Sequence, residues 1–294
     1  MPYKLEDGVT QSMLLSFLQC RQRTQNLIEG WGPVESTSVF DYGTIIHELL
    51  DLHYRGKLHA SNAKGKDLSI GWAVDAIVKE MLKKPADAQA LEESARLATM
   101  VFPGYLSFWK KQHAKWKDVQ PETVFNLKWG ATRLRGKIDL RFRLNGKLWM
   151  KETKTKSRIE EDVLDQTLAF DFQSQFYLLA LGELTGEKVE GVVYDIVRKP
   201  QMKADSVPED MRKRPDHYFK RFEVIYTKDQ NALFRQELDA ILQDFKDWAE
   251  GNAPHYRNSA SCVGRGRCPY IQACSQGSML GYVRNKKLFS ELGG

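Results

Sequence analysis

The chain has 294 residues, of which 42% are hydrophobic and 28% are charged, and its formal net charge is +6 with a sequence pI of about 9.0. This composition is ordinary for a globular protein, and the positive charge favours a polyanionic partner. The chain contains no run of about 18 apolar residues, so we expect no membrane-spanning helix. Its N-terminal segment lacks the basic-then-apolar order of a secretory signal, so we expect a cytoplasmic protein.

The first part of the chain is expected to be helical. Apolar residues recur at helical spacing in four segments, and Gly30, Gly32 and Pro33 end the first of them. Pro103 lies inside the fourth segment, where it would kink or divide the helix. The four predicted helices cover residues 11–29, 41–54, 70–84 and 88–117.

Strands dominate the middle of the chain, and helices separate some of them. Alternating or continuous apolar runs predict strands over residues 122–129, 132–144, 147–155, 189–198 and 218–226. Two helices are predicted over residues 160–185, closed by Gly186, and over residues 228–250. Residues 200–215 contain three prolines and are predicted to form a loop, and the tail from residue 252 is predicted to be irregular.

This order of elements predicts an α/β fold in which helices flank a mixed central sheet. We expect a single domain over residues 1–294. Its parts would be a helical N-terminal part (1–118), a core that contains the sheet (119–226), and a C-terminal helix with a cysteine-rich segment (227–294).

The segment 133–156 carries most of the candidate chemistry. Asn145-Gly146 favours a tight hairpin between two strands, because both residues tolerate positive φ. Apolar and charged residues alternate along the first strand, and its charged face bears one acid, Asp139, among five basic residues. On the second strand Glu152 and Lys154 are two residues apart, so they share a face.

An acid on one strand and Glu-x-Lys on the next could hold a divalent cation beside an ammonium group. The hard cation Mg²⁺ prefers oxygen ligands, which Asp139, Glu152 and the Thr153 carbonyl would supply. Lys154 would orient the attacking water or offset the charge of a phosphate. The pattern is typical of a metal-dependent phosphodiesterase, although it also occurs by chance on salt-bridged, solvent-exposed faces.

Three further residues extend this candidate site. His47 lies in a predicted helix, and an imidazole ligand would favour Mn²⁺ over Mg²⁺; the alternative is a histidine of the core. Gln173 and Tyr177 are four residues apart on a predicted helix and therefore share a face. They could position a nucleotide or brace the site, or they could simply pack in the core.

Four short motifs occur in a fixed order: Gly43…His47, Gly136-Lys-Ile-Asp139, Glu152-Thr-Lys154 and Gln173…Tyr177. Together they resemble the motifs of the PD-(D/E)XK nucleases of the RecB type, which include the nuclease domains of RecB and AddB, RecB-like CRISPR-associated nucleases and exonuclease V. The resemblance implies a restriction-endonuclease-like core. It also implies metal binding by three residues: His47, Asp139 and Glu152. Lys154 would be the catalytic lysine, with Gln173 and Tyr177 as an accessory pair.

The four cysteines are Cys20, Cys262, Cys268 and Cys274. In a reducing cytoplasm such residues bind metal more often than they form disulfides, and four thiolates suit either Zn²⁺ or a [4Fe–4S] cluster. One early and three late cysteines resemble the iron–sulfur staple of AddB, the CRISPR-associated nucleases and exonuclease V. The resemblance implies a structural [4Fe–4S] cluster, with Zn²⁺ as the alternative. The late cysteines here are spaced C-x5-C, whereas those relatives commonly have C-x2-C.

Basic residues near the candidate site are expected to follow a DNA backbone through contacts that weaken with salt. The alternative is a solvated edge of the protein. The predicted contacts are Arg135, Lys137, Arg141, Lys156, Arg158, Arg265 and Arg267. Tyr105, Trp109 and Trp116 could stack on unpaired bases, or they could belong to the core.

The sequence therefore predicts a metal-dependent DNA exonuclease that acts on single strands or DNA ends, in recombination, repair, or the processing of CRISPR or phage DNA. The alternatives are a nuclease-fold scaffold that binds DNA with a partner, a zinc-stabilised nuclease without iron, and a structure-specific endonuclease. A Walker A motif is absent from the sequence, so any unwinding would need a partner such as a helicase. An integrase or a recombinase is a further candidate partner.

Overall fold

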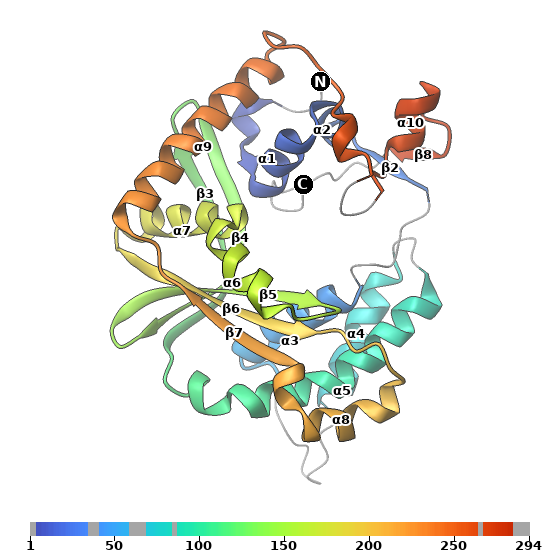
Figure 1. Ribbon diagram of the computed structural model, residues 1–294, viewed down its shortest axis with the longest axis vertical. Helices are drawn as coiled ribbons and strands as arrows, with labels where there is room; N and C mark the ends of the chain where they lie inside the picture. Colours follow the sequence, from blue (N-terminus) through green and yellow to red (C-terminus); the bar gives the residue numbers. More distant parts are fainter. Residues whose placement is uncertain (1–3, 35–40, 59–68, 84–86, 264–266, 285–294) are drawn as a thin grey trace.

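Within the described residues, which are 4–34, 41–58, 69–83, 87–263 and 267–284 of a computed structural model, six strands form a central sheet (Figure 1). Its strand order is β1-β4-β5-β6-β7, and β3 also pairs with β4. The pairs β1–β4 and β5–β6 are parallel, and the other pairs are antiparallel. The strands are β1 (Val9–Thr10), β3 (Lys117–Trp129), β4 (Thr132–Leu144), β5 (Lys147–Lys156), β6 (Val189–Arg198) and β7 (Phe219–Val224).

Helices cover both faces of this sheet, so the predicted α/β fold with a mixed central sheet is confirmed (Figure 1). The helices are α1 (Gln11–Gln19), α2 (Arg21–Ile28), α3 (Asp41–Tyr54), α4 (Ser69–Met81), α5 (Ala88–His113), α6 (Glu161–Thr167), α7 (Phe172–Thr185), α8 (Val207–Lys213), α9 (Lys228–Ala249) and α10 (Ile271–Gln276). A large core joins one face of the sheet to α1, α7 and α9, and includes Met13, Phe176 and Trp248. A second core gathers α3, α4 and α5 around residues such as Phe102.

Strand β4 packs against one hydrophobic cluster before Asp139 and against another after it. Leu134 and Ile138 pack in the large core, whereas Leu140 and Phe142 pack in a third, smaller cluster. Apolar and charged side chains alternate along β4 as predicted, but the apolar side chains before and after Asp139 belong to different hydrophobic clusters. The division falls where β4 leaves its pairing with β1 and begins to pair with β5. Asp139 therefore lies at the junction of two parts of the sheet.

Two turn predictions are confirmed. Asn145 and Gly146 have positive φ values of 52° and 79° and connect β4 to β5 in the predicted hairpin. Gly186 has a φ of 66° and ends α7, as expected for a glycine after a helix C-terminus.

The predicted helix over residues 11–29 is divided at Cys20. The backbone of Cys20 is extended, with φ of −167° and ψ of 118°, so α1 ends before it and α2 begins after it. Its thiol accepts a hydrogen bond from the backbone N–H of Asn258, at 3.4 Å, in a segment far along the chain. The break between α1 and α2 thus occurs where the chain contacts its distant C-terminal segment. The helical spacing of apolar residues did not predict this break.

The predicted helix over residues 160–185 is also divided. A 3-10 turn (Leu168–Phe170) separates α6 from α7. Asp171 is the N-cap of α7, because its carboxylate accepts hydrogen bonds from the backbone N–H and the hydroxyl of Ser174, at 3.2 and 2.7 Å. A capping aspartate inside an apolar run marks the start of a new helix.

Prolines interrupt helices less than we predicted. Pro103 lies inside α5, which is continuous from residue 88 to residue 113. The predicted loop over residues 200–215 contains α8, and Pro208 occupies one of its first two positions, where a missing N–H costs little. The predicted helix over residues 88–117 ends early, because β3 already begins at Lys117.

The tail predicted to be irregular contains α10 and a strand, β8 (Tyr282–Arg284). β8 pairs antiparallel with β2 (Trp31–Pro33), so the end of the described chain lies against its beginning (Figure 1). The single-domain organisation stays a prediction. Each helix in the described ranges is too short or too polar to cross a lipid bilayer.

Candidate active site

Asp139 of β4 is held between α3 and β5. Its Oδ2 accepts a hydrogen bond from the backbone N–H of Thr153 at 3.1 Å and lies 3.2 Å from Nδ1 of His47. Burial alone would raise the pKa of Asp139, but the charge and hydrogen bond of His47, the ammonium of Lys151 and the Thr153 N–H together lower it to about 2. The carboxylate of Asp139 is therefore held in its charged form.

Glu152 of β5 is buried, with 3% of its surface exposed. Its Oε1 accepts a hydrogen bond from Gln173 Nε2 at 3.0 Å and lies 3.2 Å from Nζ of Lys154. Its Oε2 is buried and has no hydrogen-bond partner among the described residues. Burial and the nearby charge of Asp139 raise the pKa of Glu152 to about 7. The two carboxylates therefore lie close enough to repel each other.

Gln173 connects the acid and the lysine of the candidate site. Its Oε1 accepts a hydrogen bond from Lys154 Nζ at 3.0 Å, while its Nε2 donates to Glu152. Burial would lower the pKa of Lys154, but Glu152 and Asp171 raise it on balance, so Lys154 carries a positive charge. The predicted members Glu152, Lys154 and Gln173 are thus brought together.

Tyr177 packs one turn further along α7, against the backbone of β4. A Cβ added to Gly136 would lie 2.8 Å from the Tyr177 ring and 2.7 Å from the ring of Phe125, so the ring requires a glycine there. Gly43 plays a similar part, because a Cβ at this position would lie 2.9 Å from Oγ1 of Thr155. These two glycines let α7 and α3 approach the strands that bear the acids.

The donor groups of this site fit a hard divalent cation. Asp139 and Glu152 supply carboxylate oxygens, and the unpartnered Oε2 of Glu152 would be satisfied by a cation, which would also offset the repulsion between the two acids. His47 adds an imidazole nitrogen. In the part of the chain that the structure describes, no group of three or more His, Cys, Asp or Glu side chains forms a ready-made metal site. The contact between His47 and Asp139 pairs these two potential ligands with each other.

Comparison with protein families identifies the fold. The family model of the PD-(D/E)XK nuclease superfamily matches residues 10–275. The chain belongs to the PD-(D/E)XK nuclease superfamily. A crystal structure of a Eubacterium rectale protein described as a candidate exonuclease is similar, with 13% identity, a TM-score of 0.53 and coverage of 89% of both chains.

A crystal structure of a protein named SSO0001 is also similar, with 15% identity, a TM-score of 0.39, and coverage of 93% of this chain and 88% of that one. None of the curated proteins matches the sequence. The family match places the mixed sheet and its helices in a PD-(D/E)XK nuclease core. The comparisons leave the RecB-type branch and the iron–sulfur staple as predictions.

Asp171 is a member of this candidate site that the sequence analysis missed. Its Oδ2 lies 3.4 Å from Nζ of Lys154 while it caps α7. The available signal was an aspartate two residues before Gln173, at a position where a helix cap would interrupt the predicted helix. Asp171 and Glu152 thus flank the ammonium of Lys154.

A buried charge cluster on the opposite face of β5 was missed as well. Asp195 of β6 is fully buried and accepts two hydrogen bonds from the guanidinium of Arg221, at 2.6 and 2.8 Å. Nζ of Lys151 lies 3.6 Å from Asp195, and the hydroxyl of Tyr105 donates to it. Nη2 of Arg221 lies 2.9 Å from Nε2 of His113. The signal was a charged residue within an otherwise apolar predicted strand.

The four cysteines come together near the junction of α1 and α2. None of them forms a disulfide. Burial and the nearby thiols of Cys268, Cys20 and Cys262 raise the pKa of Cys274, and the sulfur atoms of Cys20 and Cys262 both contact the backbone of Asn258, at 3.4 and 3.7 Å. The backbone N–H of Cys268 donates to the carbonyl of Cys262 at 2.9 Å. The donor set is that of a four-thiolate site, although no preformed metal site is found among the described residues.

Three of the predicted DNA contacts are engaged inside the protein. Arg135 donates to a backbone carbonyl of the segment before β1, at 3.1 Å. Lys137 forms an ion pair with Glu122, and Nε of Arg141 donates to Oε1 of Gln120 at 3.0 Å. These three residues lie on β4, and each already makes a contact within the protein with which a phosphate would compete.

The other predicted DNA contacts differ in their position. Lys156, Arg158 and Arg267 are exposed, and Arg265 lies outside the described residues. Lys156 is the last residue of β5, the strand that carries Glu152 and Lys154, and Arg158 lies two residues beyond its end. They are therefore the best placed of the predicted basic residues.

Of the two alternatives given for Tyr105, Trp109 and Trp116, stacking on bases or packing in the core, the structure supports the core. Tyr105, Trp109 and Trp116 are 1%, 8% and 7% exposed, so they belong to the core. Trp116 stacks on Phe142 with ring centroids 4.0 Å apart, and the guanidinium of Arg221 lies 4.0 Å from the centroid of Trp109. Their aromatic faces are occupied within the protein.

Proposed function

We propose that this chain is a metal-dependent DNA exonuclease of the RecB type that acts on single strands or DNA ends. The observation that carries this proposal is the buried, unpartnered Oε2 of Glu152 next to the charged carboxylate of Asp139. Such an arrangement is costly in a purely structural site, because each acid raises the energy of the other. It is expected where a cation binds during function.

The cation would be held by Asp139, Glu152 and His47, with the carbonyl of Thr153 as a further ligand. Mg²⁺ or Mn²⁺ bound there would neutralise phosphate charge and lower the pKa of a bound water. The N–H of Thr153 orients Asp139, and Gln173 orients Glu152. These contacts fix both carboxylates before a substrate arrives, which reduces the reorganisation needed for the reaction.

Lys154 would stabilise the negative charge of the phosphate. Its amine remains protonated because Glu152 and Asp171 raise its pKa, so it serves as a cation and a hydrogen-bond donor rather than as a base. The Lys154 ammonium faces three acceptors, Gln173 at 3.0 Å, Glu152 at 3.2 Å and Asp171 at 3.4 Å, so a phosphate oxygen would replace one of them. The lysine is thus positioned beside the proposed cation site.

Digestion of end-labelled DNA tests the proposal. Wild type should degrade linear single- or double-stranded DNA with Mg²⁺ or Mn²⁺, and Glu152→Gln and Lys154→Gln should each lose at least about a hundredfold in rate. Glu237→Gln is a matched control, because Glu237 is an exposed acid on α9, and it should retain full activity. Equal cleavage by wild type and both site variants would contradict the assignment. A covalently closed circle should resist digestion; its cleavage would indicate an endonuclease.

We also propose that Cys20, Cys262, Cys268 and Cys274 hold a structural [4Fe–4S] cluster. Contacts between the two ends of the chain support this, because the thiols of Cys20 and Cys262 both contact the backbone of Asn258, at 3.4 and 3.7 Å. Joining residues so far apart would stabilise the fold by an amount on the order of 5 kcal/mol at most.

Iron content and colour test the cluster. The purified protein should be brown and contain iron and sulfide, and Cys20→Ser should lose both together with thermal stability. Ser259→Ala, at an exposed serine in the cysteine segment, should retain them. A colourless protein that contains zinc, or a Cys20→Ser variant of unchanged stability, would exclude a structural iron–sulfur cluster.

A further inference from the structure

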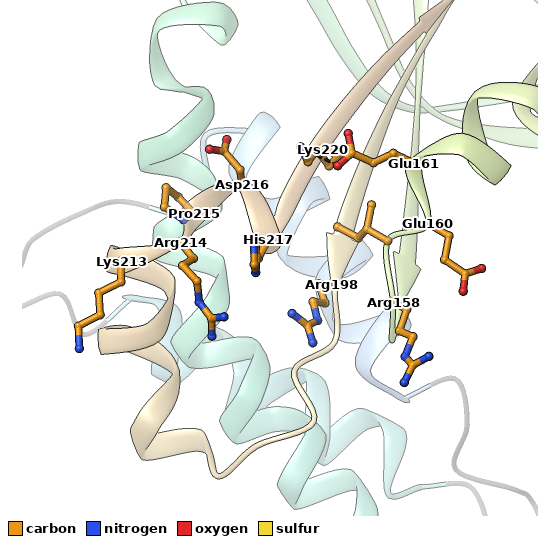
Figure 2. Close-up of a pocket in the computed structure, with 11 residues that line it drawn as sticks. Arg158, Glu160, Glu161, Arg198, Lys213, Arg214, Pro215, Asp216, His217 and Lys220 are labelled. Atoms are coloured by element: carbon orange, nitrogen blue, oxygen red, sulfur yellow. Dashed lines mark ion pairs between the residues drawn. The ribbon is translucent and has the colours of Figure 1, made fainter.

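A wide, basic pocket opens beyond the carboxyl ends of β5 and β6, outside the proposed catalytic residues. Its volume is about 740 Å³. The segment after β5 forms one wall, the end of β6 forms its floor, and the end of α8 with the following 3-10 turn (Pro215–His217) forms the other wall. Figure 2 shows Arg214 and Arg198 approaching the space from opposite sides, with His217 between them.

Positive charge dominates the lining of this pocket. Five lysine or arginine residues line it, against three acids, and one of these acids, Glu161, is neutralised by Lys220 at 2.9 Å. The carboxylates of Glu160 and Asp216 point away from Arg198 (Figure 2). Lys213 and Arg214 are likewise paired, with Glu209 and Asp210, so the positive charge that the pocket offers a ligand comes from Arg158 and Arg198.

Two guanidinium groups of this pocket have no carboxylate partner. Nε of Arg198 donates to the carbonyl of Ser157 at 3.3 Å, and no ion pair joins Arg198 to a described acid. Arg158 forms no hydrogen bond or ion pair with a described residue. A guanidinium presents a planar fork that matches the oxygens of a phosphate. The two groups are therefore available for an anionic ligand.

The strand register continues the face of the catalytic residues into the pocket. Lys154 lies opposite Ile196, and Lys156 lies opposite Arg198. Lys220 of β7 also lies opposite Ile196. Since residues paired across neighbouring strands point to the same side, all these basic residues share the sheet face that carries Lys154. A polyanion that contacts Lys154 would meet the pocket next.

We propose that this pocket binds backbone phosphates of the DNA strand whose cleavage takes place at Glu152 and Lys154. This proposal rests on the proposed function. Arg158 is four positions after Lys154, so at most about 14 Å of extended chain lies between them. That distance corresponds to about four nucleotides of a B-form strand, and to fewer in an extended single strand.

The lining favours phosphate over a nucleobase. Ile159 and Pro215 are its only apolar residues, and it contains no Phe, Tyr or Trp on which a base could stack. Contacts of this kind position a strand and carry no sequence information. The pocket would therefore hold the strand in line with the catalytic residues, whatever its sequence.

A salt-dependence experiment tests the pocket. Binding of a labelled oligothymidylate strand is measured at several salt concentrations, without added divalent cation, for wild type and for the double variant Arg158→Gln/Arg198→Gln. The double variant should bind at least about tenfold more weakly at low salt. Its slope of log affinity against log salt should fall by about 1.4, since each phosphate contact to a single strand contributes about 0.7. Lys128→Gln/Lys228→Gln removes the same charge at exposed residues outside the pocket and should leave the slope unchanged.

Equal losses in the two double variants would overturn the proposal, because they would show a general effect of net charge. A circular strand of the same length has no ends, so it shows whether the pocket binds internal phosphates or a terminal phosphate. An equal loss on the circle indicates internal phosphates, and a loss confined to the linear, 5′-phosphorylated strand indicates a terminal one.

Hydrolysis of the p-nitrophenyl ester of thymidine 5′-phosphate reports on the proposed catalytic residues alone, because this compound cannot reach the pocket. The pocket variant should lose a larger share of its rate on DNA than on this ester, and equal losses on both substrates would overturn the pocket's role. If wild type cleaves neither the ester nor DNA with Mg²⁺ or Mn²⁺, the proposed function fails, while the binding comparison still decides whether the pocket holds phosphates.

Discussion

Acidification should destabilise the protein through His113, at the end of α5. The Nε2 atom of His113 lies 2.9 Å from Nη2 of Arg221. Because a guanidinium only donates hydrogen bonds, this nitrogen must be the unprotonated acceptor of a neutral ring. Burial lowers the pKa of His113 most, the charges of Arg221 and Lys151 lower it further, Asp195 opposes them, and the resulting pKa is about 3.

The direction of the effect follows from the proton balance. The unfolded chain binds a proton at His113 below its ordinary pKa of 6.5, whereas the folded protein binds it only below about 3. The stability contributed by the neutral ring is therefore complete above pH 6.5 and is lost progressively as the pH falls towards 3. Between pH 7 and pH 5 this loss should be about 2 kcal/mol, from 1.36 kcal/mol for each pKa unit.

Urea unfolding at pH 7 and pH 5 measures this loss. His113→Gln removes the titrating group and keeps a hydrogen-bond acceptor, so its free energy of unfolding should change less than that of wild type between these pH values, by about 2 kcal/mol. Gln112→Ala changes the exposed neighbour and should retain the wild-type dependence on pH. Parallel pH dependence in wild type and His113→Gln would refute the reasoning.

Two further substitutions should lower stability for different reasons. Asp195→Asn should cost about 3–5 kcal/mol in urea unfolding, because it leaves the buried cations of Arg221 and Lys151 without their counter-charge; an unchanged midpoint would contradict the buried ion cluster. Gly136→Ala should cost about 1–3 kcal/mol by overpacking, since the added methyl group would meet two aromatic rings at under 3 Å. Gly71→Ala is the control, because a Cβ at Gly71 meets nothing within 4 Å. This variant should be neutral or stabilise α4 by up to about 1 kcal/mol. Equal melting temperatures for the two alanine variants would disprove the tight packing at Gly136.

The strands that carry Asp139 and Glu152 could be predicted from sequence because their signals are local. The alternation of side chains has a period of two residues, and the Asn-Gly turn fixes where β4 and β5 meet. These two facts are enough to place Glu152 and Lys154 on one face. The contact of His47 with Asp139 was implied only by the family resemblance, because no local rule relates a helix to a strand so far along the chain.

Features that depend on distant contacts were not predicted. The break at Cys20 accompanies contacts with the chain near Asn258, and helical spacing within α1 and α2 carries no trace of them. The partnership of Asp171 with Lys154 needs the start of α7 to lie beside the end of β5. The cluster around Asp195 gathers charges from β5, β6 and β7, so no single segment reveals it.

The charges on the two faces of β5 also protect the alignment of this strand. Lys151 points to Asp195, and the next residue, Glu152, points to the opposite layer beside Asp139. A shift of β5 by one residue would exchange them, setting one carboxylate against Asp195 and an ammonium in the place of Glu152 beside Asp139. Both of these unfavourable charge contacts would be buried, where water screens charges poorly. A molecule with β5 misaligned would therefore unfold. Folded molecules that carry a defective arrangement of acids should therefore be very rare.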